Sequence, residues 1–266
     1  MGSRSGDSSP GRKRRITVRC TRSRGPRGFF CLQVDRRGPV IVDAMRLRQM
    51  ASPKPTIYLL PGMNSHYPVY SRLLPLVENV KVVDFIEPEP RESLPSYAER
   101  MSCYFDTAAY IGGVSFGGIL AQEISRIIKP RGCLLISTIV GPHQLPPSVR
   151  GFRAIGRRTY SNAHKLLCRS ASFVPRRIRT SATYRIGRLA GENGNWQRWA
   201  TGAILDWNPD VGSIPVPTLQ IHGDADRTFP INLTTPDIIV PTGRHALPVS
   251  HPEEVAAAIH RLRTAA

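Results

Sequence analysis

The sequence lacks the patterns that assign a cofactor or a metal. Its 266 residues include five cysteines, none in a C-x-x-C pair, and this odd number argues against a disulfide framework and a zinc cluster. There is no G-x-G-x-x-G stretch or Walker loop, and no group of histidine, cysteine and aspartate has the spacing of metal ligands. We therefore expect no cofactor and no metal. The scattered cysteines favour a reducing cytoplasm.

Long apolar runs are missing as well. No run is long enough to cross a membrane, and the apolar stretch GFFCLQV near the arginine-rich N-terminus is too short for a secretory signal. These absences predict a soluble protein that is not exported and has no membrane partner. With 41% hydrophobic residues, the chain is long enough for one large α/β domain.

Acidic residues are scarce in two regions, and these regions account for the net charge of +18. Residues 1–54 hold 14 Lys/Arg and 3 Asp/Glu, a net of +11, and residues 150–190 hold 11 basic and no acidic residues, again +11. The remainder carries 12 basic and 16 acidic residues, a net of −4. No recognition helix or aromatic RNA-binding strand accompanies the basic regions, so we do not expect nucleic-acid binding to be the main function.

Residues 1–54 are poor in apolar residues and rich in Arg, Ser and Gly. Such a segment buries too little apolar surface to offset the entropy of ordering it, so we expect a basic, disordered N-terminal extension. An alternative is that translation begins at Met45 or Met50, just before the first convincing strand.

From residue 55 onward, short apolar runs rich in β-branched residues alternate with helix-like segments. The runs suit buried parallel strands; they are TIYLL (56–60), VKVVDFI (80–86), AAYIGGV (108–114), GCLLIST (132–138), PTLQIHG (217–223) and DIIVP (237–241). Helices are expected at YSRLLPLVE near residue 70, at FGGILAQEISRIIK from 116 and at PEEVAAAIHRLR from 252. This alternation predicts an α/β fold with a doubly wound, mostly parallel sheet. Residues 141–210 lack a clear strand and read as a helical cap inserted over the strand ends.

A cluster of glycines surrounds Ser115 at the end of one predicted strand. The stretch Gly113-Val114-Ser115-Phe116-Gly117 matches the G-x-S-x-G nucleophile elbow, in which a sharp strand-to-helix turn lifts the serine above the sheet. The small residues let strand and helix approach each other. Taken alone, such a turn could also be a packing device or a phosphate cradle, because a motif needs its structural context.

The base and the acid that a nucleophilic serine needs follow in the chain. Asp224 and Asp226 come just after the predicted strand 217–223, and His245 follows the strand 237–241. The order serine, acid, histidine is that of α/β-hydrolases and differs from the orders in chymotrypsin-like and subtilisin-like enzymes.

Over roughly residues 55–262, the chain resembles the α/β-hydrolase superfamily. The resemblance is carried by LLPGMNSHYPVY, GGVSFGG, IHGDADRTFP and GRHALPVSHPEEVAAAI. It implies an α/β-hydrolase domain over residues 55–266. In this family the acid follows a glycine by three positions and precedes a proline by four, which implies Asp226 as the acid and Asp224 as a turn former. The resemblance also implies that the backbone N–H groups of Met63 and Phe116 bind the oxyanion.

The oxyanion loop departs from one subgroup of the family. Pro61 precedes Gly62, where many relatives have His-Gly or the HGGG version of esterases, so the lipase-like subgroup is not indicated. A serine at the elbow also speaks against epoxide hydrolase and haloalkane dehalogenase chemistry, which uses an aspartate there.

The resulting hypothesis is a serine hydrolase acting on a carboxylic ester or a related small-molecule acyl substrate. Ser115 attacks the carbonyl, His245 takes its proton, Asp226 orients the imidazole, and water releases the acyl group. His66 and Trp199 are candidate substrate-binding residues, although a surface-loop histidine and a cap tryptophan can equally serve solubility and packing. His222, at the end of a buried strand, reads as a structural histidine.

Two other classes of function remain open. One is a non-hydrolytic enzyme of the same fold, such as a cofactor-free lyase or a haloperoxidase-like enzyme, because fold does not fix reaction. The other is a catalytically silent binding protein, including one that binds nucleic acid through its basic tail.

Overall fold

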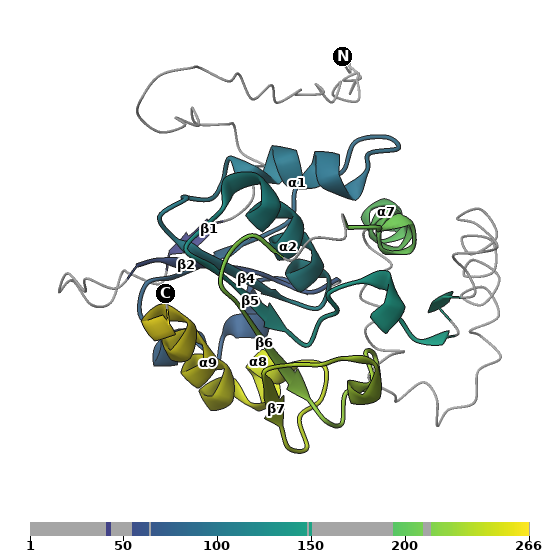
Figure 1. Cartoon of the computed structure of the whole chain (residues 1–266). Coiled ribbons are helices and arrows are strands. Elements are labelled where there is room, and N and C mark those ends of the chain that lie inside the picture. Colours follow the sequence, from purple (N-terminus) through teal and green to yellow (C-terminus); the bar gives the residue numbers. More distant parts are fainter. Residues whose placement is uncertain are drawn as a thin grey trace, which may run out of the picture.

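A seven-stranded sheet forms the centre of the molecule (Figure 1). The computed structural model describes residues 41–43, 55–63, 65–147, 149–150, 194–209 and 214–265. The strands are β1 (Ile41–Asp43), β2 (Ile57–Leu60), β3 (Val80–Val83), β4 (Tyr110–Val114), β5 (Gly132–Ile136), β6 (Thr218–Gly223) and β7 (Ile238–Val240). Their order is β1-β3-β2-β4-β5-β6-β7, with β1 antiparallel and all other pairs parallel. The predicted mostly parallel, doubly wound sheet is confirmed.

Helices cover both faces of this sheet. They are α1 (Leu94–Ser102), α2 (Phe116–Ile128), α7 (Gly194–Asp206), α8 (Leu247–Ser250) and α9 (Pro252–Ala265). Figure 1 shows α1 and α2 on one side and α9 on the other. Alternate residues of a strand point to opposite faces. Accordingly, Tyr58 and Leu60 of β2 join the core beneath α1 and α2, whereas Ile57 and Leu59 join the core beneath α9.

The helix expected near residue 70 is wrong. Two short 3₁₀ helices lie here instead. One, η2 (Tyr67–Tyr70), ends at the first residue of the expected helix, and the other, η3 (Leu74–Leu76), lies within it. Pro68 and Pro75 each lie in the first turn of one of them. A proline lacks the N–H that a longer helix needs and clashes with the preceding turn, so no continuous helix forms here.

Part of the expected N-terminal extension is ordered. Residues 41–43 form β1 and pair with β3, with Ile41 opposite Val83 and Asp43 opposite Lys81. A chain that began at Met45 or Met50 would lack this strand. Residues 1–40 and 44–54 lie outside the described part, so the expectation of disorder there stays a prediction.

Of the expected cap, the structure describes η4 (Pro142–Gln144) and α7, while residues 151–193 lie outside the described part. Within the residues that the structure describes, no helix has the length and apolar character to cross a membrane.

Candidate active site

Ser115 lies on a sharp corner between β4 and α2. Its backbone has φ 55° and ψ −121°, a conformation that side-chain-bearing residues rarely adopt and that the surrounding structure must hold in place. The corner is tight: a Cβ on Gly113 would lie 2.4 Å from the carbonyl carbon of Gly117, and one on Gly117 would lie 2.3 Å from the carbonyl oxygens of Leu60 and Pro61. The glycines are therefore needed because strand, helix and the loop after β2 meet here.

The structure brings Ser115, His245 and Asp226 together from three different strand ends. His245 Nε2 is 2.9 Å from Ser115 Oγ, and His245 Nδ1 is 2.8 Å from Asp226 Oδ2. A carboxylate only accepts hydrogen bonds, so His245 Nδ1 carries a proton and donates a hydrogen bond to Asp226. Nε2 is then free to accept from the serine hydroxyl. This is the protonation state in which an imidazole can act as a general base.

Asp226 is held by more groups than His245 alone. Its side chain is fully buried, and Oδ1 accepts from the backbone N–H groups of Thr228 at 2.7 Å and Phe229 at 3.1 Å. Burial by itself would raise the pKa of this carboxyl, but hydrogen bonds from His222 and His245 outweigh burial and hold the pKa well below its usual value. Asp224, the other aspartate of this loop, is exposed.

The segments that carry the two expected oxyanion donors lie beside Ser115. Phe116 is the first residue of α2, so no preceding helical turn accepts its N–H. The loop that carries Met63 passes beside Ser115, since a Cβ on Gly62 would lie 3.4 Å from Ser115 Cβ. Met63 itself packs against the core beneath α1 and α2, and its Sδ lies 3.8 Å from Thr201 Oγ1 of α7.

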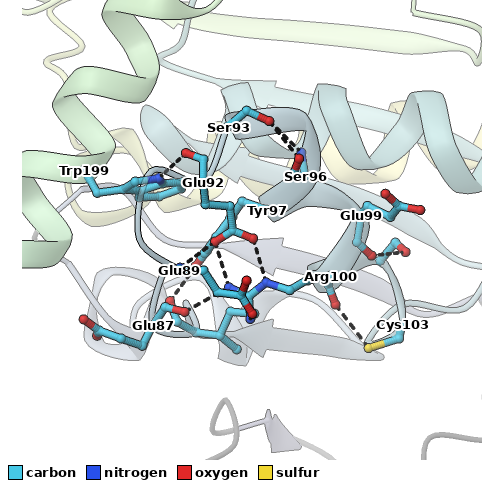
Figure 2. Close-up of polar contacts among 12 residues, drawn as sticks. Glu87, Glu89, Glu92, Ser93, Ser96, Tyr97, Glu99, Arg100, Cys103 and Trp199 are labelled. Atoms are coloured by element: carbon cyan, nitrogen blue, oxygen red, sulfur yellow. Dashed lines mark hydrogen bonds and ion pairs between the residues drawn. The ribbon is translucent and has the colours of Figure 1, made fainter. Parts of the chain in front are cut away.

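The two expected substrate-binding residues differ in their surroundings. The His66 side chain is 68% exposed, and its Nδ1 is 3.9 Å from a carboxylate oxygen of Asp84. Trp199 is buried, and its indole N–H donates to Glu92 O at 2.8 Å (Figure 2). The centroid of a Trp199 ring lies 4.3 Å from the ring centroid of Tyr97 and 6.0 Å from that of Phe116. Trp199 thus packs α7 against the body beside a candidate oxyanion residue; substrate contact by either residue stays a prediction.

Three residues that the sequence does not indicate as part of the site contact the backbone or the side chains of its members. The Tyr70 hydroxyl donates to Leu60 O at 2.7 Å and accepts from Val114 N at 3.1 Å, which ties the end of β2 to the end of β4. Thr138 Oγ1 donates to Ser115 O at 2.7 Å. His222, which the sequence marked as structural, lies 3.3 Å from Asp226 Oδ2 through Nε2. No short motif marks any of these three roles.

Among the residues that the structure describes, no group of three or more His, Cys, Asp or Glu side chains could hold a metal ion.

Comparison with solved structures relates this geometry to known folds. A thermophilic esterase from Thermogutta terrifontis superposes with a TM-score of 0.57 at 17% identity, covering 85% of this chain and 97% of that one. The type II thioesterase YbtT from a yersiniabactin biosynthetic pathway gives 0.58 at 15% identity, covering 79% and 93%. The chain has the α/β-hydrolase fold.

Sequence comparison adds little to this α/β-hydrolase-fold assignment. No protein-family model matches the chain. A protein of Synechocystis sp. provisionally named a non-heme chloroperoxidase is 37% identical over 62 residues, which span 20% of this chain and only 22% of that protein. At these identities the similarities establish the fold, and the reaction has to be argued from the site.

Proposed function

We propose that this α/β-hydrolase-fold protein is a serine hydrolase that cleaves carboxylic esters through an acyl-enzyme intermediate. The observation that carries the proposal is the continuous set of contacts from Ser115 Oγ to His245 at 2.9 Å and from His245 to Asp226 at 2.8 Å. A serine hydroxyl is a weak nucleophile until a base accepts its proton, and the base needs a group that fixes its tautomer.

The proposed reaction has two halves. Ser115 Oγ attacks the ester carbonyl carbon while His245 Nε2 takes its proton. The bond to the leaving oxygen then breaks as His245 returns that proton to the departing alcohol. Water attacks the acyl-enzyme, again losing a proton to His245, which passes it to Ser115. The N–H groups of Met63 and Phe116 would stabilise the oxyanion in both halves, each contributing roughly 3 kcal/mol.

Several features support an acyl substrate without naming it. Solved structures with this fold include an esterase and a type II thioesterase, so both oxygen and sulfur esters belong in a substrate panel. We propose that His66, at an exposed position of the oxyanion loop, and Trp199 border the bound substrate. The scattered cysteines support a cytoplasmic location for this activity.

The test is a chain-length panel of p-nitrophenyl esters and thioesters with wild type and Ser115→Ala. We expect turnover by the wild type and a loss of about 10³-fold or more in kcat for the variant, because the remaining residues of a triad act poorly without the nucleophile. Ser102→Ala is the matched control and should keep wild-type rates, because this half-buried serine ends α1 and its hydroxyl donates to Glu99 O of the same helix. Wild-type rates in Ser115→Ala would refute the proposal.

A non-hydrolytic reaction is the second candidate, because a provisional chloroperoxidase matches part of the chain. Product analysis distinguishes it: a hydrolase releases the free carboxylic acid and alcohol. A silent binding protein would not react with a fluorophosphonate at Ser115. A salt-sensitive gel shift that disappears when residues 1–54 are deleted would point to nucleic-acid binding by the basic tail.

A further inference from the structure

His222 is a buried titratable side chain that the proposed reaction does not use. It lies on β6, four residues before Asp226, and is fully buried. Its Nε2 is 2.8 Å from Phe229 O and 3.3 Å from Asp226 Oδ2. Both oxygens only accept, so the ring proton lies at Nε2 and faces both of them. Nδ1 is buried and has no hydrogen-bond partner among the described residues, which also favours this tautomer.

These contacts close a ring around the carboxylate of Asp226. Phe229 donates its N–H to Asp226 Oδ1 at 3.1 Å and accepts from His222 through its carbonyl oxygen at 2.8 Å. His222 in turn faces Asp226 Oδ2. One side chain at the end of β6 therefore contacts both the loop that carries Asp226 and the carboxylate itself.

The oxygen that His222 faces is the same one that binds the candidate base. Asp226 Oδ2 lies 2.8 Å from His245 Nδ1 and 3.3 Å from His222 Nε2. In the part of the chain that the structure describes, these two histidines, from β6 and from the loop after β7, are the titratable side chains recorded in contact with Asp226. The negatively charged Oδ2 thus faces two imidazole rings: the buried ring of His222 and the ring of His245, which gains and loses a proton in the proposed reaction.

We propose that His222 is a positioning residue of the triad, which holds Asp226 in the rotamer that meets His245 and moderates the charge that Oδ2 presents to it. This inference rests on the proposed function. Removing the His222 N–H frees the carboxylate to rotate and misplaces His245, which slows the chemical step. It also leaves Oδ2 to His245 alone. That alters how strongly the carboxylate stabilises the protonated imidazole, so the acid limb of the kcat/KM profile shifts.

The experiment compares His222→Leu, which removes both ring nitrogens, with His222→Gln, whose side-chain amide can still donate near the Nε2 position. His260→Leu, at an exposed histidine of α9, is the matched control. Active sites are counted by fluorophosphonate titration, so that kcat is expressed per folded, reactive molecule. For His222→Leu we expect kcat to fall by up to about 100-fold, the size of effect that a small misplacement can have, with KM nearly unchanged. His222→Gln should recover most of the rate, and His260→Leu should match wild type.

A second readout does not need turnover. The proton between His245 Nδ1 and Asp226 should give a downfield ¹H NMR signal that moves in His222→Leu and returns in His222→Gln. If wild type hydrolyses esters but His222→Leu keeps the signal, the pH midpoint and kcat per active site, with only thermal stability reduced, the positioning role is refuted. Equal losses in the Leu and Gln variants would refute it as well. A wild type without esterase activity whose signal still depends on His222 would refute the proposed function and support the positioning role.

Discussion

At the scale of single residues, Tyr70 holds the backbone that surrounds the nucleophile. Its hydroxyl is fully buried and bridges Leu60 O and Val114 N, the ends of two neighbouring strands. Burial raises the pKa of this phenol far above its usual value, so the hydroxyl stays protonated and can both donate and accept. Val114 precedes Ser115, and Leu60 precedes the oxyanion loop. The hydroxyl therefore ties the strand end before Ser115 to the strand end before the loop that carries Met63.

Tyr70→Phe should lower both stability and activity. The substitution keeps the ring but leaves a buried carbonyl and a buried N–H unpaired, at a cost of about 1–3 kcal/mol in the free energy of unfolding. We also expect a lower kcat, because the two strand ends that carry the site are no longer tied. Urea unfolding and ester kinetics measure the two effects. Tyr110→Phe is the control: its hydroxyl lies at the opposite end of β4, 3.4 Å from Arg263 O, so kcat should not change.

Some residues of the candidate site can be predicted from the sequence, and others cannot. Ser115, Asp226 and His245 follow strands and carry short local signals, so they can be predicted before any coordinates. Tyr70 acts on groups 10 and 44 residues away, and Thr138 on a carbonyl 23 residues away. The local sequence pattern does not indicate hydrogen bonds between residues so far apart in the chain. The sequence indicates only a structural role for His222, because the contact of His222 with Asp226 depends on how the loop after β6 turns.

At the scale of elements, a charged pair joins α1 to the loop before it, next to the point where α7 is attached. Arg100 of α1 donates to both carboxylate oxygens of Glu92, at 2.6 and 2.9 Å (Figure 2). The Glu92 side chain is 5% exposed and that of Arg100 is 28% exposed. Hydrogen bonding to Glu92 raises the pKa of Arg100 above its ordinary value. The backbone carbonyl of Glu92 accepts from Trp199, so this pair also steadies the attachment of α7.

Arg100→Met should cost more stability than a surface ion pair would. The variant leaves a nearly buried carboxylate without its cation. We expect a loss between the roughly 1 kcal/mol of an exposed pair and the roughly 3–5 kcal/mol of a fully buried one, because Arg100 is partly solvated. Adding Glu92→Met should restore part of the loss, which a double-mutant cycle measures. Glu89→Gln is the control, since Glu89 is 59% exposed and 3.9 Å from the same arginine. A single variant as stable as wild type would contradict this account.

Elements were predictable where one pattern dominated locally. The six parallel strands are short apolar runs, largely buried in all but the edge strand β7, and α2 and α9 carry clear helical periodicity. The helix expected at residues 70–78 does not form, because its apolar spacing suits a helix while Pro75 in its interior disfavours a continuous one. The short helix α1 was not predicted, although Ser93 caps it by accepting from Ser96 N at 3.2 Å. Strand β1 lies in a basic, polar region of the sequence, and it is a strand because it pairs with β3.

At the scale of the whole molecule, the buried acid of the candidate triad links activity to stability in acid. The pKa of Asp226 is lowered in the folded state relative to the 3.8 of an unperturbed aspartate. Between these two pKa values the unfolded chain binds a proton that the folded chain does not. The ionised Asp226 therefore stabilises the fold fully above about pH 4, and this contribution is lost as the pH falls toward the folded-state pKa. The hydrogen bonds that orient His245 are thus also a source of stability at neutral pH.

Asp226→Asn should flatten the dependence of the unfolding free energy on pH in acid. For wild type, one proton taken up on unfolding gives a slope of up to about 1.4 kcal/mol per pH unit below pH 4, in addition to the slope from all other groups. The amide cannot titrate, so the variant loses this component while activity also falls. Urea unfolding at intervals between pH 3 and pH 6 measures the slopes. Asp224→Asn, at the exposed aspartate two positions earlier, should keep the wild-type slope. Identical slopes in wild type and Asp226→Asn would mean that the carboxylate is not stabilised in its charged form, and the network of donors around it would then need another purpose.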